Sequence, residues 1–140
     1  MAHTEPVSSI MTSSVVFANK SESLRKVTSI MKEHNVRHLP VVAGDTLAGI
    51  VSKSDILRLS FGDVYEDQSE IDETIFDMLK LEQVMVSNPT TVNADDSIAD
   101  VARILSRAEF HALPVMKGNQ VVGIVSTTDL IKYLLGEAGN

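Results

Sequence analysis

Two short segments carry the residue types best suited to hold a phosphorylated ligand. Ser52 and Asp55 follow a Gly-Ile-Val run, and Ser126 and Asp129 follow an identical run later in the chain. A serine with an acid three residues on predicts a capping box at a helix start, where each side chain bonds the other residue's backbone N–H. The same helix N-terminus attracts phosphate, and the carboxylate can accept both hydroxyls of a ribose. The motif alone leaves capping and ligand binding both open.

Basic residues precede the strands that lead into these motifs. Arg37 and His38 stand before Leu39, and His111 holds the equivalent place in the second half of the chain. Cations are favoured at a helix C-terminus, and arginine also fits the geometry of phosphate. These residues are therefore either helix-end cations or contacts to ligand phosphates.

No pattern of a metal site or a catalytic centre stands out. His34 and His38 have the i, i+4 spacing of a helical metal pair, but no third ligand lies nearby and the helix is expected to end at Asn35. The sequence has no Gly-x-Ser-x-Gly nucleophile motif and no Walker loop, and it contains no cysteine. We therefore expect neither an enzyme nor a metal protein.

Composition argues against several further classes of protein. The chain has 140 residues and a net charge of −7, so nucleic acid and anionic membranes are poor partners. No apolar run reaches 18 residues and the first residues lack a signal-peptide core, so the protein is expected to be cytoplasmic. The acidity is local: residues 60–83 hold eight acids and one base, whereas the remainder holds 11 of each.

An internal repeat organises these features. Residues 10–59 align with residues 84–133 without a gap, with 15 identities in 50. Each copy predicts a short strand (15–18 or 90–92), an amphipathic helix capped by Ser21 or Asp95, a two-strand hairpin, and a second helix opening near Ser54 or Thr128. The apolar stripe of the first helix is formed by Leu24, Val27, Ile30 and Met31 in one copy and by Ile98, Val101, Ile104 and Leu105 in the other.

The fold class expected is therefore α/β (α+β), with two β-α-β-β-α repeats packed around a pseudo-twofold axis. One unit of about 50 residues buries too little surface to be stable alone. The first repeat spans residues 7–60 and the second spans residues 84–136. The acidic linker, residues 61–83, has apolar residues at spacing four (Ile71, Ile75, Leu79) that predict a helix of its own, with Ser69 and Asp72 as its cap.

The repeated motifs resemble the CBS-domain family in its tandem arrangement, the Bateman module. The resemblance rests on Met11 and Met85 at the openings, on Leu-Pro-Val at Leu39 and Leu113, and on Gly-Ile-Val-Ser-x-x-Asp, each present twice. It implies a stand-alone regulatory sensor with no required cofactor, which binds AMP, ADP or ATP in clefts between the repeats. It also implies a homodimer and an unidentified regulated protein as partners.

The resemblance assigns roles by position. Asp55 and Asp129 match the ribose-binding aspartate, and Arg37, His38 and His111 match phosphate-contacting positions. The adenine-flanking positions are Val16, Val36, Thr90 and Phe110. The hydroxyl residues around ribose and phosphates are Ser52, Ser54, Ser126, Thr127 and Thr128.

Other functions stay open at this stage. Ala112 stands where the first copy has His38, so the first cleft is expected to meet phosphate charge better, or the second to prefer a less charged ligand. Another adenosyl ligand, such as S-adenosylmethionine or NAD, is one alternative. A structural or interaction protein with vestigial clefts is another.

Overall fold

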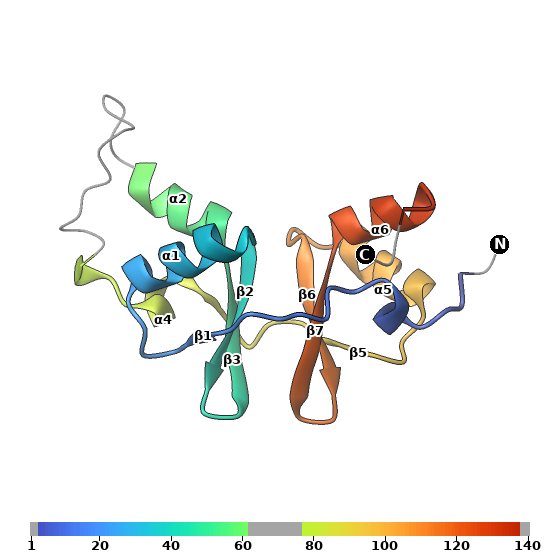
Figure 1. Ribbon diagram of the computed structural model, residues 1–140, viewed down its shortest axis with the longest axis horizontal. Coiled ribbons are helices and arrows are strands. Elements are labelled where there is room, and N and C mark those ends of the chain that lie inside the picture. Colours follow the sequence, from blue (N-terminus) through green and yellow to red (C-terminus); the bar gives the residue numbers. More distant parts are fainter. Residues whose placement is uncertain (1–2, 62–76, 138–140) are drawn as a thin grey trace. The chain divides into compact units, whose positions relative to one another are not determined.

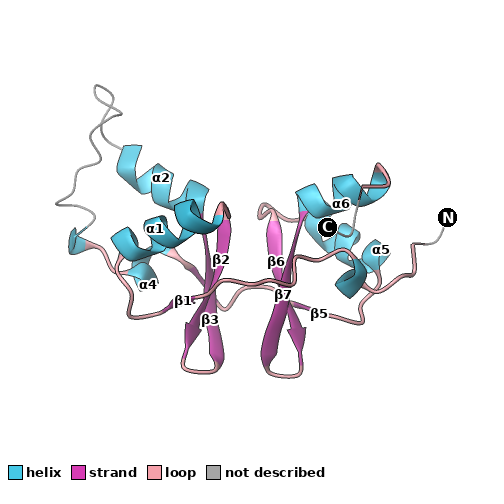
Figure 2. Ribbon diagram, viewed as in Figure 1, coloured by secondary structure: helices cyan, strands magenta, loops and turns pink. Residues whose placement is uncertain are grey.

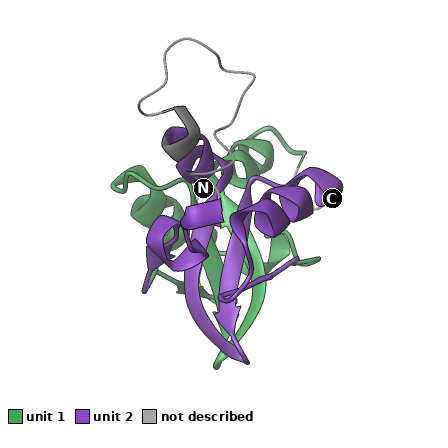
Figure 3. Ribbon diagram, turned by 90° about the vertical axis from the view of Figure 1, so that its left-hand side faces the viewer, with its two compact units in different colours: residues 1–15, 89–140 green, residues 16–88 purple. Residues whose placement is uncertain are grey.

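The protein forms two compact α/β units, which confirms the predicted fold class. A computed structural model describes residues 3–61 and 77–137 (Figure 1). One unit contains residues 16–88, and the other combines residues 1–15 with residues 89–140 (Figure 3). We call them the first-repeat unit and the second-repeat unit, after the hairpin that each contains.

The first-repeat unit has a four-stranded sheet in the order β1-β2-β3-β4 (Figure 2). β1 runs parallel to β2, and the other neighbours are antiparallel. The elements are β1 (Ala18–Asn19), α1 (Leu24–His34), β2 (His38–Ala43), β3 (Thr46–Ser52), α2 (Lys53–Phe61), α4 (Leu81–Val84) and β4 (Val86–Ser87).

The second-repeat unit repeats this plan with a three-stranded sheet in the order β5-β6-β7. β5 is parallel to β6, and β6 is antiparallel to β7. The elements are the 3-10 helix η1 (Val7–Ser9), β5 (Val92–Asn93), α5 (Ile98–Ser106), β6 (Ala112–Lys117), β7 (Gln120–Ser126) and α6 (Thr127–Leu134).

The first helix of each repeat starts later than its sequence suggests. Ser23 and Ser97 are the N-caps, and their side chains accept the backbone N–H of Lys26 and Asp100. The assignment of Ser21 as a cap was wrong, because Asn19 Oδ1 accepts both the backbone N–H and the hydroxyl of Ser21 in a tight turn before the helix. Asp95 is likewise two residues too early to cap its helix.

The hairpins follow the prediction. Gly44 and Gly118 open the two-residue loops with φ values of 64° and 62°, a conformation that glycine adopts without steric cost. Each hairpin brings the start of one strand beside the end of the next. The residue before each Leu-Pro-Val therefore lies opposite the serine that opens the capping box.

Most of the predicted apolar stripe is buried in two separate cores. In α1 all four stripe residues are at most 9% exposed, whereas in α5 Ile104 is 36% exposed and the other three are buried. The first-repeat core contains Ala18, Leu24, Val27, Ile30, Met31, Leu39, Val41, Val51, Ile56 and Leu81. The second-repeat core contains Val7, Ile10, Val92, Ile98, Val101, Leu105, Leu113, Val115 and Val125.

The leading segment of each repeat packs against the other repeat, which the alignment did not foresee. Val7, at the start of the first repeat, is fully buried in the second-repeat core. Leu81, just before the second repeat, is fully buried in the first-repeat core, and Val84 and Met85 at the start of that repeat pack against the same core. Thr12 exchanges two backbone hydrogen bonds with Ile124, at 2.8 and 3.0 Å. The compact units are therefore not the same residues as the sequence repeats.

This crossing explains the glycine in both Gly-Ile-Val runs. A Cβ built on Gly49 would lie 2.6 Å from the Val86 carbonyl oxygen and 2.8 Å from Met85 Sδ. A Cβ on Gly123 would overlap Met11 Sδ and lie 2.9 Å from the Thr12 carbonyl oxygen. Only glycine leaves room for the backbone that crosses each strand.

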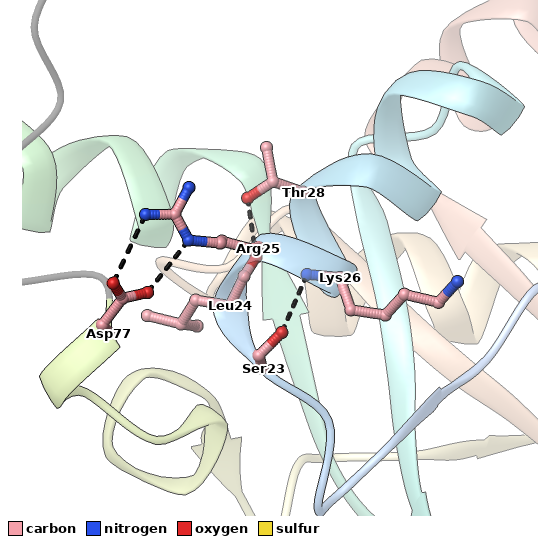
Figure 4. A network of polar contacts seen from close by, with 6 residues as sticks. All are labelled: Ser23, Leu24, Arg25, Lys26, Thr28 and Asp77. Carbon is pink, nitrogen blue, oxygen red and sulfur yellow. Dashed lines mark hydrogen bonds and ion pairs between the residues drawn. The ribbon is translucent and has the colours of Figure 1, made fainter. Parts of the chain in front are cut away.

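The described end of the acidic linker is tied to the first-repeat unit by ion pairs. Arg25 on α1 donates from Nε and Nη2 to the two carboxylate oxygens of Asp77, at 2.9 and 3.5 Å (Figure 4). This guanidinium holds the pKa of Asp77 below its ordinary value. A second ion pair joins Lys20 Nζ to Glu82 Oε2 at 3.6 Å. The helix predicted around Ile71 and Ile75 lies outside the described residues.

Within residues 3–61 and 77–137, no helix is long and apolar enough to cross a membrane.

Candidate ligand-binding sites

Both Ser-x-x-Asp motifs form complete capping boxes. Asp55 donates its backbone N–H to Ser52 Oγ at 3.0 Å, and the Ser52 N–H returns a bond to Asp55 Oδ2 at 3.2 Å. In the second repeat the corresponding distances are 3.2 Å for Asp129 to Ser126 Oγ and 2.9 Å for Ser126 to Asp129 Oδ2. Each box uses one carboxylate oxygen, so capping and ligand binding do not exclude each other.

A backbone bond joins each helix start to the basic residue of its repeat. Lys53, the first residue of α2, donates its N–H to the Arg37 carbonyl at 2.8 Å. Thr127 donates to the His111 carbonyl at 3.0 Å. The next residues pair across the strands, His38 with Ser52 and Ala112 with Ser126. The sequence-predicted basic and hydroxyl residues therefore come together in each unit.

We call the residues around the start of α2 the first-repeat group and those around the start of α6 the second-repeat group. Their hydroxyl and carboxylate residues are half-buried or exposed, and no charged residue is fully buried in the described structure. The first-repeat group consists of Val36, Arg37, His38, Ser52, Lys53, Ser54, Asp55 and Arg58. The second-repeat group consists of Phe110, His111, Ala112, Ser126, Thr127, Thr128, Asp129 and Lys132.

The remaining adenine-flanking residues lie just outside the strands in which they were expected. Val16 precedes β1 by two residues, and Thr90 precedes β5 by two. Because β1 is parallel to β2 and β5 to β6, both residues lie toward the strand ends where the groups form. Val16 is half-buried against the first-repeat core, whereas Thr90 is exposed. Val36 packs against the same core, and Phe110 is 39% exposed.

The carboxylate oxygen that takes no part in the capping box, Oδ1, has different contacts in Asp55 and Asp129. Asp55 Oδ1 lies 3.6 Å from Arg58 Nη2, one turn along α2. The residue equivalent to Arg58 is Lys132, and the described part of the chain places no ion pair or hydrogen bond on Asp129 Oδ1. Sequence reasoning missed Arg58, although an acid followed by an arginine three residues later on a helix predicts such a pair.

The histidine pair does not form a helical metal site. α1 ends at His34, and its C-cap Asn35 turns the chain with φ 53° and ψ 47°, so His38 belongs to β2. Among the described residues, no cluster of three or more His, Asp or Glu side chains has the arrangement of a metal site.

A sequence profile of the CBS domain matches the chain twice, over residues 7–62 and 81–136. The chain belongs to the CBS-domain family. Protein MJ0188 of Methanocaldococcus jannaschii is 36% identical over 127 residues, which cover 90% of this chain and 43% of that protein. A homoserine O-acetyltransferase of Methanocorpusculum labreanum is 30% identical over 89% of this chain, but only 23% of that enzyme is matched.

Solved CBS domain pairs share the fold. The CBS domain pair of protein MJ0100, in complex with 5'-methylthioadenosine and S-adenosyl-L-methionine, has a TM-score of 0.78 at 25% identity and covers 94% of this chain and 97% of its own. CBSX2 in complex with AMP has a TM-score of 0.75 at 25% identity, with 94% and 97% coverage. The chain spans less than half the length of three curated relatives that it matches.

Proposed function

We propose that this CBS-domain chain is a regulatory module that binds adenosine-containing ligands, with AMP, ADP or ATP as the first candidates. The observation that carries the proposal is the pair of helix starts. Each places a carboxylate, a set of hydroxyls and a basic residue in one group, held by backbone bonds of 2.8 and 3.0 Å. Such a group offers an acceptor for ribose and donors for phosphate. The complexes of the two solved relatives with AMP and with adenosyl ligands support the same chemistry.

The module acts by binding and not by catalysis in this proposal. The described groups contain no nucleophile paired with a base and no metal cluster, and CBS domain pairs are generally regulatory. Ligand binding shifts a conformational equilibrium by at most its differential affinity for the two states. The match to part of an acetyltransferase supports a regulated protein as the partner.

A thermal-shift panel tests the proposal. Adenosine, AMP, ADP, ATP, NAD and S-adenosylmethionine, each at millimolar concentration, are compared with GMP and GTP as controls for charge. Binding to the native state raises the melting temperature, by an amount that grows with concentration above the dissociation constant. The double variant Asp55→Asn with Asp129→Asn should lose the adenosine-specific shift. No shift with any adenosine compound would leave the structural or interaction protein as the function.

We also propose that the chain forms a homodimer. The C-terminal end of α6 exposes Ile131, Leu134 and Leu135, which are 57%, 72% and 67% exposed. An apolar end of this kind favours association with another protein surface. Sedimentation velocity across a concentration series distinguishes a dimer from a monomer, and a monomer at every concentration would contradict this part.

A further inference from the structure

Residues 3–6 run antiparallel to the start of α5 and supply it with backbone acceptors (Figure 1). The N–H of Ile98 donates to the Glu5 carbonyl at 2.9 Å, and the N–H of Ala99 donates to the His3 carbonyl at 3.1 Å. Both N–H groups belong to the first turn of α5, where no carbonyl of the helix itself can accept them. We call residues 3–6 the strap, because they lie across the open end of this helix.

One end of the strap is fixed by burial and the other by side-chain contacts. Val7, the residue after the strap, is fully buried in the second-repeat core, whereas residues 4–6 are exposed. The Tyr133 hydroxyl donates to Glu5 Oε2 at 2.8 Å and lies 2.7 Å from His3 Nδ1. The Tyr133 ring packs against the same core as Val7. Tyr133 therefore ties the strap to α6.

The backbone of His3 needs support from such contacts. Its φ of 51° lies in the left-handed region, which is unfavourable for a residue other than glycine. A residue keeps this conformation only where the surrounding contacts outweigh the strain. The bond to the Tyr133 hydroxyl and the edge-to-face contact of the two rings are contacts of this kind. Loss of the Tyr133 hydroxyl is therefore expected to favour release of the strap.

The equivalent segment of the first-repeat unit is fastened to a different helix. At the repeat offset of 74, Asp77 aligns with His3. The Asp77 carboxylate accepts hydrogen bonds from Arg25 on α1, the first helix of that unit. The strap is tied instead to α6, whose start belongs to the second-repeat group. The tyrosine contact thus joins the strap to a proposed ligand site, which the Asp77 contact does not do.

We propose that the strap and α6 open and close as one cooperative unit, and that a ligand at the start of α6 keeps the strap closed. α6 has eight residues, and its last turn exposes Leu134, so the helix depends on its neighbours for stability. A ligand that binds only the folded helix stabilises it by mass action, and Tyr133 passes this stabilisation to the strap. The inference rests on the proposed function and adds to it a segment that responds to occupancy of the second-repeat group.

Hydrogen exchange of the full chain, measured by NMR, follows both parts of the unit. The amides of Ile98 and Ala99 report on the strap, because their acceptors are strap carbonyls. The amides of residues 131–134 report on α6. The amides of Thr127 and Thr128, which we call the second-repeat amides, report bound AMP by their chemical shifts. At about ten times its dissociation constant, AMP should slow exchange about tenfold at the strap and α6 reporters alike.

Tyr133→Phe separates the strap from α6, because it removes the hydroxyl and keeps the ring that packs on the core. Without ligand, exchange should become about two- to tenfold faster at both sets of reporters. With AMP, exchange should still slow in α6 but no longer at Ile98 and Ala99. Asp77→Asn is the matched control, because it weakens the equivalent tie on α1 and should leave the response of the strap to AMP unchanged.

The outcomes separate the inference from the function beneath it. If AMP shifts the second-repeat amides and slows exchange in α6 but not at the strap reporters of the native chain, the inference is wrong and the proposed function stands. A strap that still responds to AMP in Tyr133→Phe would also overturn the inference. Second-repeat amides that stay unshifted by AMP, ADP and ATP would overturn the proposed function at this group, whereas the ligand-free comparison would still test the cooperative unit.

Discussion

Tyr133 on α6 donates its hydroxyl proton to Glu5 Oε2 at 2.8 Å, across 128 positions of the sequence. His3 Nδ1 lies 2.7 Å from the same hydroxyl, and the two rings meet edge to face with centroids 5.4 Å apart. Since the hydroxyl proton goes to Glu5, the bond from His3 places its proton on Nδ1. The leading segment is thus bonded to the helix that begins at the Ser126 capping box.

This contact predicts a pH-dependent contribution to stability. Its own backbone N–H and the Tyr133 hydroxyl hold the pKa of Glu5 below its usual value, so the stabilisation is lost as pH falls through that lowered pKa. The same hydrogen bond raises the pKa of Tyr133, so stabilisation is also lost as pH rises through that raised pKa. The melting temperature of Tyr133→Phe should therefore lie below that of the native chain near pH 7 and converge with it below about pH 4.

His3→Gln is the companion variant, because it keeps a side-chain donor without a charge. At pH 7 the melting temperature of His3→Gln should stay close to that of the native chain and well above that of Tyr133→Phe. A native-to-variant gap in melting temperature that is constant from pH 3 to pH 8 would contradict the assignment of the Glu5 contact.

The glycine in Gly-Ile-Val should be required by packing. Gly123→Ala should lower the free energy of unfolding by about 1–3 kcal/mol, because the new methyl group meets Met11 and the Thr12 backbone. Adding Met11→Ala should recover only part of this loss, since the carbonyl oxygen of Thr12 remains 2.9 Å away. Urea denaturation measures both effects, and an unchanged midpoint for Gly123→Ala would contradict the close approach.

Capping and ligand binding should be separable at the second helix start. Ser126→Ala should cost about 1 kcal/mol of stability, because the N–H of Asp129 loses its acceptor. Asp129→Asn keeps an oxygen for the Ser126 N–H and should cost less, yet weaken AMP binding at the second-repeat amides about tenfold. Calorimetry and NMR titration measure the two quantities. Equal affinity in Asp129→Asn and the native chain would leave only the capping role.

The crossed leading segments predict which unit each core substitution weakens. Val7→Ala should lower hydrogen-exchange protection in α5 and β6, with a loss of about 1–3 kcal/mol. Leu81→Ala should do the same in α1 and β2, with a loss of about 2–5 kcal/mol. The two variants are controls for each other. Loss of protection in α1 and β2 for Val7→Ala, or in α5 and β6 for Leu81→Ala, would contradict the crossing.

The repeat made much of the fold predictable. Its apolar periodicity placed α1 and α5, and the glycines at 44 and 118 placed the hairpins. The helix starts were misplaced by two residues, because Ser21 and Ser23 are equally good caps and only the turn made by Asn19 decides between them. A propensity scale cannot distinguish such neighbours.

The crossing could not be predicted from the sequence, and the ion pair of Asp55 was missed although its spacing was visible. Val7 and Leu81 are apolar and fully buried, but an apolar residue does not by itself indicate which of two similar cores it joins. Arg58 has the right spacing, but its contact depends on side-chain rotamers. The ligand roles of the site residues stay predictions, supported by how the two groups assemble around the capping boxes.

The crossing also sets an order for folding during synthesis. The first-repeat unit is one continuous stretch, residues 16–88, and has all its parts once β4 has left the ribosome. The second-repeat unit combines residues that precede the first-repeat unit with residues that follow it. Val7 and Ile10 are synthesised before β6 and β7, so their apolar side chains lack these core partners until both strands emerge. Chaperone capture of nascent chains is therefore expected at this early segment.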